Sequence, residues 1–213
     1  MSPLAPLAAI LAGGRSRRMG TDKVTLPLAG IPLLERVWSR VARAAERVVV
    51  VGGVPRLDGK GVPTLPDLYP GADSMGGVAT ALAHAALALE TDGPVLCVAC
   101  DLPFVEPALL RYLVSLCPGW EAVVPRVAAG YEPLCALYRP SALPFFEREI
   151  GRGNLRVRDA FGRLRTREVG EEELRRFDPE LCSFLNVNRP EDLERARHRL
   201  EGGEGTPCAY RDP

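Results

Sequence analysis

Residues 8–23 read AAILAGGRSRRMGTDK, and this stretch indicates both the fold class and the chemistry to expect. The apolar run 8–12 predicts a short buried strand that ends at Gly13 and Gly14. Because glycine has no Cβ, the backbone amides of such a turn can approach an anion closely. Four cations follow within nine residues, namely Arg15, Arg17, Arg18 and Lys23. Guanidinium and ammonium groups suit phosphate oxygens, so the segment predicts a strand followed by a polyphosphate-binding turn.

The spacing in this stretch excludes two common phosphate-binding motifs. The dinucleotide pattern G-x-G-x-x-G fails because no third glycine stands at the required distance from Gly13 and Gly14. A P-loop requires Gly-Lys-Ser/Thr five residues after its first glycine, where this chain has Arg18 and Met19. A hydride-transfer enzyme and a P-loop NTPase are therefore disfavoured.

Beyond this stretch, short apolar runs alternate with segments of helical periodicity. This alternation predicts an α/β fold, a three-layer sandwich around a mostly parallel sheet. Further strands are expected at 47–51, 62–65, 94–99, 122–124, 134–138 and 183–187. Helices are expected at 31–45, 74–89 with Ser74 as N-cap, 107–116, 142–149, 155–161 and 190–200.

The composition is that of an ordinary globular protein. The 213 residues carry 27 basic and 27 acidic side chains, so the formal net charge is zero and a strong polyanion binder is disfavoured. Hydrophobic residues make up 46%, which suffices for one core. We predict a single domain over 1–200 and a disordered Gly-rich tail over 201–213. No apolar run reaches the roughly 18 residues of a membrane span, and no export signal precedes the first strand, so a cytoplasmic protein is expected.

The six cysteines are expected to be buried free thiols. Disulfides are disfavoured in a chain of this length without an export signal. Cys97 and Cys100 form the only close pair. An offset of three residues in a strand points two side chains to opposite faces, which argues against a zinc site there.

Acidic residues follow two of the predicted strands. Asp101 comes after the run 94–99, and Asp67 follows the run 62–65. Ligands of α/β proteins gather at the carboxyl edge of the sheet, where the first glycine turn is also expected. A carboxylate that faces a phosphate-binding turn suits Mg²⁺, so Asp101 is the predicted metal ligand and Asp67 a weaker candidate. The simpler alternative is that each residue only caps a turn.

Two asparagines lie at the end of the last predicted strand. Asn186 and Asn188 alternate there, so both side chains can point into one cleft as neutral ligands for metal or substrate. Capping of the helix that begins at Pro190 is the simpler alternative.

Together these motifs resemble those of the molybdenum cofactor guanylyltransferases, nucleotidyltransferases with a Rossmann-like fold of the nucleotide-diphospho-sugar transferase type. The resemblance extends over residues 7–200. It rests on the segments 11–23 (LAGGRSRRMGTDK), 67–71 (DLYPG), 100–103 (CDLP), 132–134 (EPL) and 184–193 (FLNVNRPEDL).

The resemblance implies a reaction and a set of site residues. The phosphate of molybdenum-loaded molybdopterin would attack the α-phosphorus of GTP, form the guanine dinucleotide cofactor and release pyrophosphate. Nucleotide and metal would bind at Leu11, Ala12, Gly13, Gly14, Lys23, Asp67, Asp101, Asn186 and Asn188, with Lys23, Arg17 and Asp101 as catalytic residues and Asp101 as ligand of Mg²⁺. The partners implied are GTP and molybdopterin, with transient contacts to molybdenum-insertion or acceptor enzymes; a monomer that binds neither nucleic acid nor membrane is expected.

One position departs from the family pattern. Val51 stands where the family has an Asn that helps to read the base, and a valine side chain forms no hydrogen bonds. A molybdopterin cytidylyltransferase or another NTP-dependent nucleotidyltransferase is the nearest alternative. The cytidylyltransferases, however, tend to have Ala-Ala-Gly in the first loop and aspartates in place of the two asparagines. A non-catalytic adaptor that binds nucleotide or cofactor is the second alternative.

Overall fold

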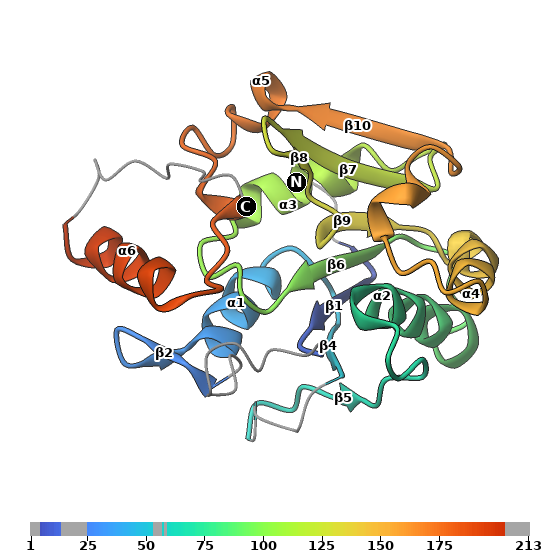
Figure 1. Ribbon diagram of the computed structural model, residues 1–213, viewed down its shortest axis with the longest axis horizontal. Helices are drawn as coiled ribbons and strands as arrows, with labels where there is room; N and C mark the ends of the chain where they lie inside the picture. The colour runs from blue at the N-terminus through green and yellow to red at the C-terminus, as the bar shows by residue number, and fades with distance from the viewer. Residues whose placement is uncertain (1–4, 14–24, 53–56, 58, 203–213) are drawn as a thin grey trace.

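The computed structural model describes residues 5–13, 25–52, 57 and 59–202. Its centre is an eight-stranded sheet of order β10-β7-β9-β6-β1-β4-β5, with β8 paired to β7 (Figure 1). The strands are β1 Leu7–Leu11, β4 Val48–Val51, β5 Thr64–Leu65, β6 Val95–Ala99, β7 Ala122–Val127, β8 Gly130–Tyr131, β9 Cys135–Tyr138 and β10 Thr166–Gly170. β1 pairs in parallel with both β4 and β6, and β9 runs antiparallel to β6 and β7. The predicted mostly parallel sheet is confirmed.

Helices cover both faces of this sheet because successive strand residues point to opposite sides. Ala8 and Ile10 of β1 belong to a cluster with α1 (Leu33–Val41) and α3 (Pro107–Ser115). The other residues of β1 pack with α2 (Asp73–Ala83) and α4 (Leu143–Gly151). The short α5 (Glu171–Leu174) lies beside β10. The predicted three-layer sandwich is therefore confirmed.

A third apolar cluster attaches the C-terminal part to the sheet. A hairpin of β2 (Pro27–Leu28) and β3 (Ile31–Pro32) lies beside α6 (Pro190–Glu201), as Figure 1 shows. The buried members of the cluster are Leu28, Leu33, Phe104, Cys182, Val187, Leu193 and Ala196. Because Phe104 follows β6 closely, this cluster brings the hairpin and α6 to the end of β6.

The predicted strand 183–187 is wrong. A 3-10 turn, Cys182–Phe184, occupies its first part, and residues 185–188 form no strand. Phe184 packs in the cluster of α1 and α3, whereas Val187 packs in the cluster of α6. The apolar residues are buried as predicted, but the backbone hydrogen bonds go to loops rather than to a neighbouring strand.

Several other predictions differ in detail. β10, the β2–β3 hairpin and α5 were not predicted. The predicted helix 31–45 is shorter than expected, because residues 31–32 belong to β3 and α1 ends at Val41. Ser74 is not the N-cap, because α2 begins at Asp73 without a side-chain cap, and the helix continues as a π-helical turn at His84–Ala88. The predicted helix 155–161 is only a 3-10 turn at Val157–Ala160.

Of the six cysteines, four follow the prediction, Cys182 does not, and Cys208 lies outside the described residues. Cys97, Cys100, Cys117 and Cys135 are buried free thiols. Burial raises the pKa of Cys97 to about 12, which keeps this thiol protonated at neutral pH. Cys182, in contrast, is disulfide-bonded, which contradicts the expectation of free thiols for that residue.

The C-terminal tail and the membrane are the subjects of two further expectations. The predicted tail begins at the last residue of α6, and its residues 203–213 lie outside the described part. Among the helices of the described residues, none combines the length and the apolar character that crossing a membrane requires.

Candidate functional site at the carboxyl edge of the sheet

The carboxyl ends of β1, β4 and β6 lie level at one edge of the sheet. Leu11 pairs with Val51 on one side and with Ala99 on the other. The ladder continues one residue further, because the Ala12 amide donates to the Val51 carbonyl at 2.9 Å and the Cys100 amide donates to the Leu11 carbonyl at 3.1 Å. Since β1 has a parallel neighbour on each side, the loops after β1 and β6 leave the sheet at its switch point, where open α/β sheets bind ligands.

Two glycines make the backbones of neighbouring loops touch at this edge. A Cβ on Gly52 would lie 2.9 Å from the Cα of Gly13, and a Cβ on Gly13 would lie 3.3 Å from the Cα of Gly52. Gly52 also has φ of +77°, a conformation that side chains disfavour. Gly13 is exposed and Ala12 is half-buried. The described part of the turn after β1 therefore presents the main chain of Gly13 at the surface.

Part of the predicted phosphate-binding turn lies outside the described residues. This applies to Gly14, Arg17 and Lys23, together with Arg15 and Arg18. The described part of the chain ends at Gly13 before this gap and resumes at Thr25, just before the β2–β3 hairpin, whose Leu28 belongs to the same apolar cluster as Val187.

Asp101 stands at the end of β6, directly beside the turn after β1. It is half-buried, and its Oδ1 atom is shielded from solvent. Its carbonyl oxygen accepts a hydrogen bond of 3.0 Å from the Val187 amide. The structure thus brings the segment with Asn186 and Asn188 to Asp101, although 187 − 101 = 86 residues separate the bonded pair.

Residues 186–188 form a segment that we call the asparagine segment. Its middle residue, Val187, is fully buried. Asn186 is half-buried and Asn188 is exposed. The Asp192 carboxylate accepts the Asn188 amide at 3.0 Å, so the start of α6 restrains this end of the segment. The N-cap of α6 is Arg189, whose amide also donates to Asp192 at 2.9 Å, so Asn188 precedes the cap rather than forming it, and the segment lies beside Asp101.

Asp67 lies at the same edge, after β5, and its carboxylate is oriented from α2. Its Oδ1 atom accepts the Tyr69 amide at 2.9 Å and the Thr80 hydroxyl at 3.3 Å. The Thr80 hydroxyl in turn accepts the Leu68 amide at 3.0 Å. Sequence reasoning missed Thr80, because a threonine in an apolar helix is not distinguished from a core residue.

The Glu132-Pro133-Leu134 segment also reaches this edge, because β9 begins there antiparallel to β6. The Leu134 carbonyl accepts the Ala99 amide at 2.7 Å, and the buried Tyr138 hydroxyl donates to the Pro133 carbonyl at 2.7 Å. Glu132 is only 8% exposed. Burial is the main cause that raises the pKa of Tyr138 well above its usual value, so its hydroxyl remains a donor.

Val51 cannot contact a ligand at this edge through its side chain. It is 1% exposed and packs with α2 in the core.

The side chains predicted to bind at this edge offer oxygen atoms as metal ligands. Within the described ranges, His, Cys, Asp and Glu form no group of three that could hold a metal ion by themselves. Mg²⁺ does not require such a group, since it is commonly bound by one or two carboxylates together with substrate phosphates and water. Asp101, whose main chain is bonded to the residue between Asn186 and Asn188, fits that pattern.

Comparisons with known proteins agree with this arrangement. Residues 8–167 match the family described as the MobA-like NTP transferase domain. A probable molybdenum cofactor guanylyltransferase of Pelotomaculum thermopropionicum is 35% identical over 90% of this chain and 92% of its own length. The molybdenum cofactor guanylyltransferase of Desulfosudis oleivorans is 33% identical over 91% of this chain and 95% of its own.

Solved structures agree as well. The crystal structure of molybdopterin-guanine dinucleotide biosynthesis protein A from Archaeoglobus fulgidus superposes with a TM-score of 0.78 at 32% identity, and the match covers 92% of this chain and 100% of that one. With its glycine turn, Asp101 and the asparagine segment gathered at one sheet edge, the chain belongs to the MobA-like NTP transferase family of nucleotidyltransferases.

Proposed function

We propose that this protein transfers GMP from GTP to molybdenum-loaded molybdopterin, which yields the guanine dinucleotide form of the cofactor and pyrophosphate. The observation that carries the proposal is the Val187–Asp101 hydrogen bond of 3.0 Å. It joins the motifs 100–103 and 184–193, which are far apart in the sequence, beside the turn after β1. The names of the relatives support the choice of GTP and of a molybdenum pterin as substrates.

The nucleotide triphosphate is assigned to the turn after β1. Leu11, Ala12, Gly13 and Gly14 supply main chain, and Arg17 and Lys23 supply positive charge. Asp67, oriented by Thr80, is assigned to the nucleoside end. These groups bind and orient the triphosphate, and the cations offset charge that develops on the leaving pyrophosphate.

A divalent ion, Mg²⁺, is assigned to Asp101, with Asn186 and Asn188 as neighbouring oxygen donors. Such an ion supplies charge neutralisation on the phosphates. The acceptor needs no general base from this chain, because a phosphate monoester has a second pKa of about 6 and is ionised at neutral pH. Positioning and electrostatics are then the main tasks of the protein.

The remaining assignments are a single domain over residues 1–200 and a cytoplasmic monomer. It would contact molybdenum-insertion or acceptor enzymes only transiently. Neither nucleic acid nor membrane is assigned as a partner, in keeping with the zero net charge.

The test is pyrophosphate release on mixing the protein with GTP, Mg²⁺ and molybdopterin. Asp101→Asn should abolish turnover with the fold intact, because it removes the charge assigned to the metal. Asp92→Asn is the matched control, since Asp92 is exposed just before the opposite end of β6. Retained activity in Asp101→Asn would show that the metal assignment is wrong. Binding of GTP without any pyrophosphate release in the wild type would favour the adaptor alternative.

A further inference from the structure

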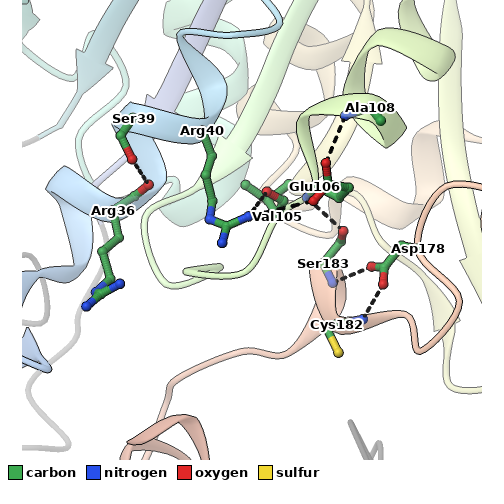
Figure 2. Close-up of polar contacts among 9 residues, drawn as sticks. All are labelled: Arg36, Ser39, Arg40, Val105, Glu106, Ala108, Asp178, Cys182 and Ser183. Atoms are coloured by element: carbon green, nitrogen blue, oxygen red, sulfur yellow. Dashed lines mark hydrogen bonds and ion pairs between the residues drawn. The ribbon is translucent and has the colours of Figure 1, made fainter. Parts of the chain in front are cut away.

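Asp178 is a buried carboxylate outside every motif discussed so far. It is 8% exposed, and both of its oxygens accept backbone amides, Oδ1 from Cys182 at 3.1 Å and Oδ2 from Ser183 at 2.7 Å (Figure 2). Burial of a carboxylate is costly unless hydrogen bonds compensate for the lost hydration. Here those bonds hold the 3-10 turn that precedes the asparagine segment.

Ser183 extends this network to the loop that follows Asp101. Its side chain is fully buried, and its hydroxyl accepts the Glu106 amide at 2.9 Å. From the opposite side, the Arg40 guanidinium of α1 donates to the Val105 carbonyl at 3.3 Å (Figure 2). The loop between β6 and α3 is therefore attached to the turn at its far end.

The near ends of the two segments are joined as well, by the Val187–Asp101 hydrogen bond of 3.0 Å. Residues 101–106 and 183–187 thus form a closed ring, bonded at Glu106–Ser183 and at Asp101–Val187. Asp178 binds the ring at Ser183 only. Val187 lies only four positions after Ser183. A movement of the 3-10 turn would therefore also displace Val187 and, through its hydrogen bond, Asp101.

We propose that Asp178 is a positioning residue for the divalent-cation site, which holds the asparagine segment against Asp101 without touching the cation itself. This inference rests on the proposed function, because it concerns the metal assigned to Asp101. It predicts that metal affinity depends on the hydrogen bonds that Asp178 accepts, whereas a purely structural Asp178 would affect only the free energy of unfolding.

The test is Mn²⁺ binding, measured by electron paramagnetic resonance in the presence of a non-hydrolysable GTP analogue. Asp178→Asn retains the size of the side chain but turns one acceptor into a donor that faces a backbone N–H. We expect roughly 10-fold weaker Mn²⁺ binding, the scale found for residues that orient metal ligands. Binding of the analogue without metal should stay within about twofold, because within the described residues the Asp178 carboxylate accepts hydrogen bonds from Cys182 and Ser183 and not from residues 11–13.

Glu121→Gln is the matched control, since this carboxylate also accepts a backbone amide, from Arg165 at 3.0 Å, but at the opposite edge of the sheet. It should leave Mn²⁺ binding unchanged. Ser183→Ala is the second variant, and it decides the question if Asp178→Asn does not fold; it should also weaken Mn²⁺ binding.

The outcomes separate the inference from the proposed function. Folded variants that bind Mn²⁺ like the wild type would overturn the inference alone. A wild-type protein that binds no Mn²⁺ with nucleotide would overturn both this inference and the metal assignment. Normal wild-type Mn²⁺ binding without guanylyl transfer would refute the reaction, while weaker binding by Asp178→Asn would still support the positioning role.

Discussion

At the scale of single residues, Gly13 and Gly52 show how a backbone contact shapes a binding edge. A side chain at either position would separate two loops that now touch. The sequence identified Gly13 because two glycines follow an apolar run, but the contact with Gly52 depends on β1 and β4 being neighbours in the sheet.

Replacement of Gly52 tests this contact. Gly52→Ala places a Cβ 2.9 Å from the Gly13 Cα and forces alanine to φ of +77°. The left-handed conformation alone costs about 1–2 kcal/mol, and the overlap should add about 1–3 kcal/mol to the loss of unfolding free energy. We expect GTP affinity to fall as well, because the turn after β1 is displaced. Urea denaturation and nucleotide titration measure the two effects.

Gly119→Ala is the control for the conformational part. Gly119 has φ of +83° and no atom within 4 Å of its added Cβ, and it lies before β7 at the other edge of the sheet. The Gly119→Ala variant should lose only the conformational cost in unfolding free energy, and it should bind GTP with normal affinity. Equal effects of the two substitutions on stability and on GTP binding would contradict the importance of the contact.

Residues whose partners are distant in the sequence are difficult to predict from the sequence. The position of Asp101 at the sheet edge could be predicted because it follows a strand, and strand ends meet at one edge. Asp178 and Thr80 could not, since their partners are backbone groups and a carboxylate brought near by the tertiary fold.

At the scale of elements, the predictions succeeded where burial determines the pattern locally. β6 and α3 agree within one residue at each end, since β6 is apolar throughout and Pro107 begins α3. β10 was missed because it is an edge strand, in which Arg167 and Glu168 are only half-buried and break the apolar pattern. The segment 183–187 resembles a strand, but no strand partner is available to it.

The segment beside α6 allows an element-scale prediction. Val187→Ala removes buried methyl groups from the cluster beneath α6 and should cost about 1–3 kcal/mol of unfolding free energy. We also expect a raised Mg²⁺ requirement, because the segment becomes looser against Asp101. Val169→Ala is the matched control, since Val169 of β10 is equally buried in another cluster. Chemical denaturation and Mg²⁺ titration of pyrophosphate release distinguish the two variants; the same Mg²⁺ requirement in both would contradict the expectation.

At the scale of the whole molecule, ligand binding should stabilise the fold measurably. A ligand at about 100 times its Kd adds about 2.7 kcal/mol to the unfolding free energy. For a chain of this size the melting temperature should then rise by about 5–10 °C. We expect this rise with GTP and Mg²⁺, a smaller one with CTP and Mg²⁺, and little effect of Mg²⁺ alone. Thermal denaturation with each nucleotide measures the difference, and equal protection by CTP would contradict guanine selection.

The long-range pairings at the site also bear on biosynthesis. Leu11 pairs with Ala99, and the Val187 amide reaches the Asp101 carbonyl, so the joined residues are 99 − 11 = 88 and 187 − 101 = 86 positions apart. Chains emerge from the ribosome N-terminal end first, and non-local contacts form slowly. A nascent chain must therefore be synthesised at least as far as Val187 before these contacts can form. The pairing of Leu11 with Val51 needs far less of the chain, so β1 and β4 can associate before the segment with Asp101 and the segment with Val187 join them.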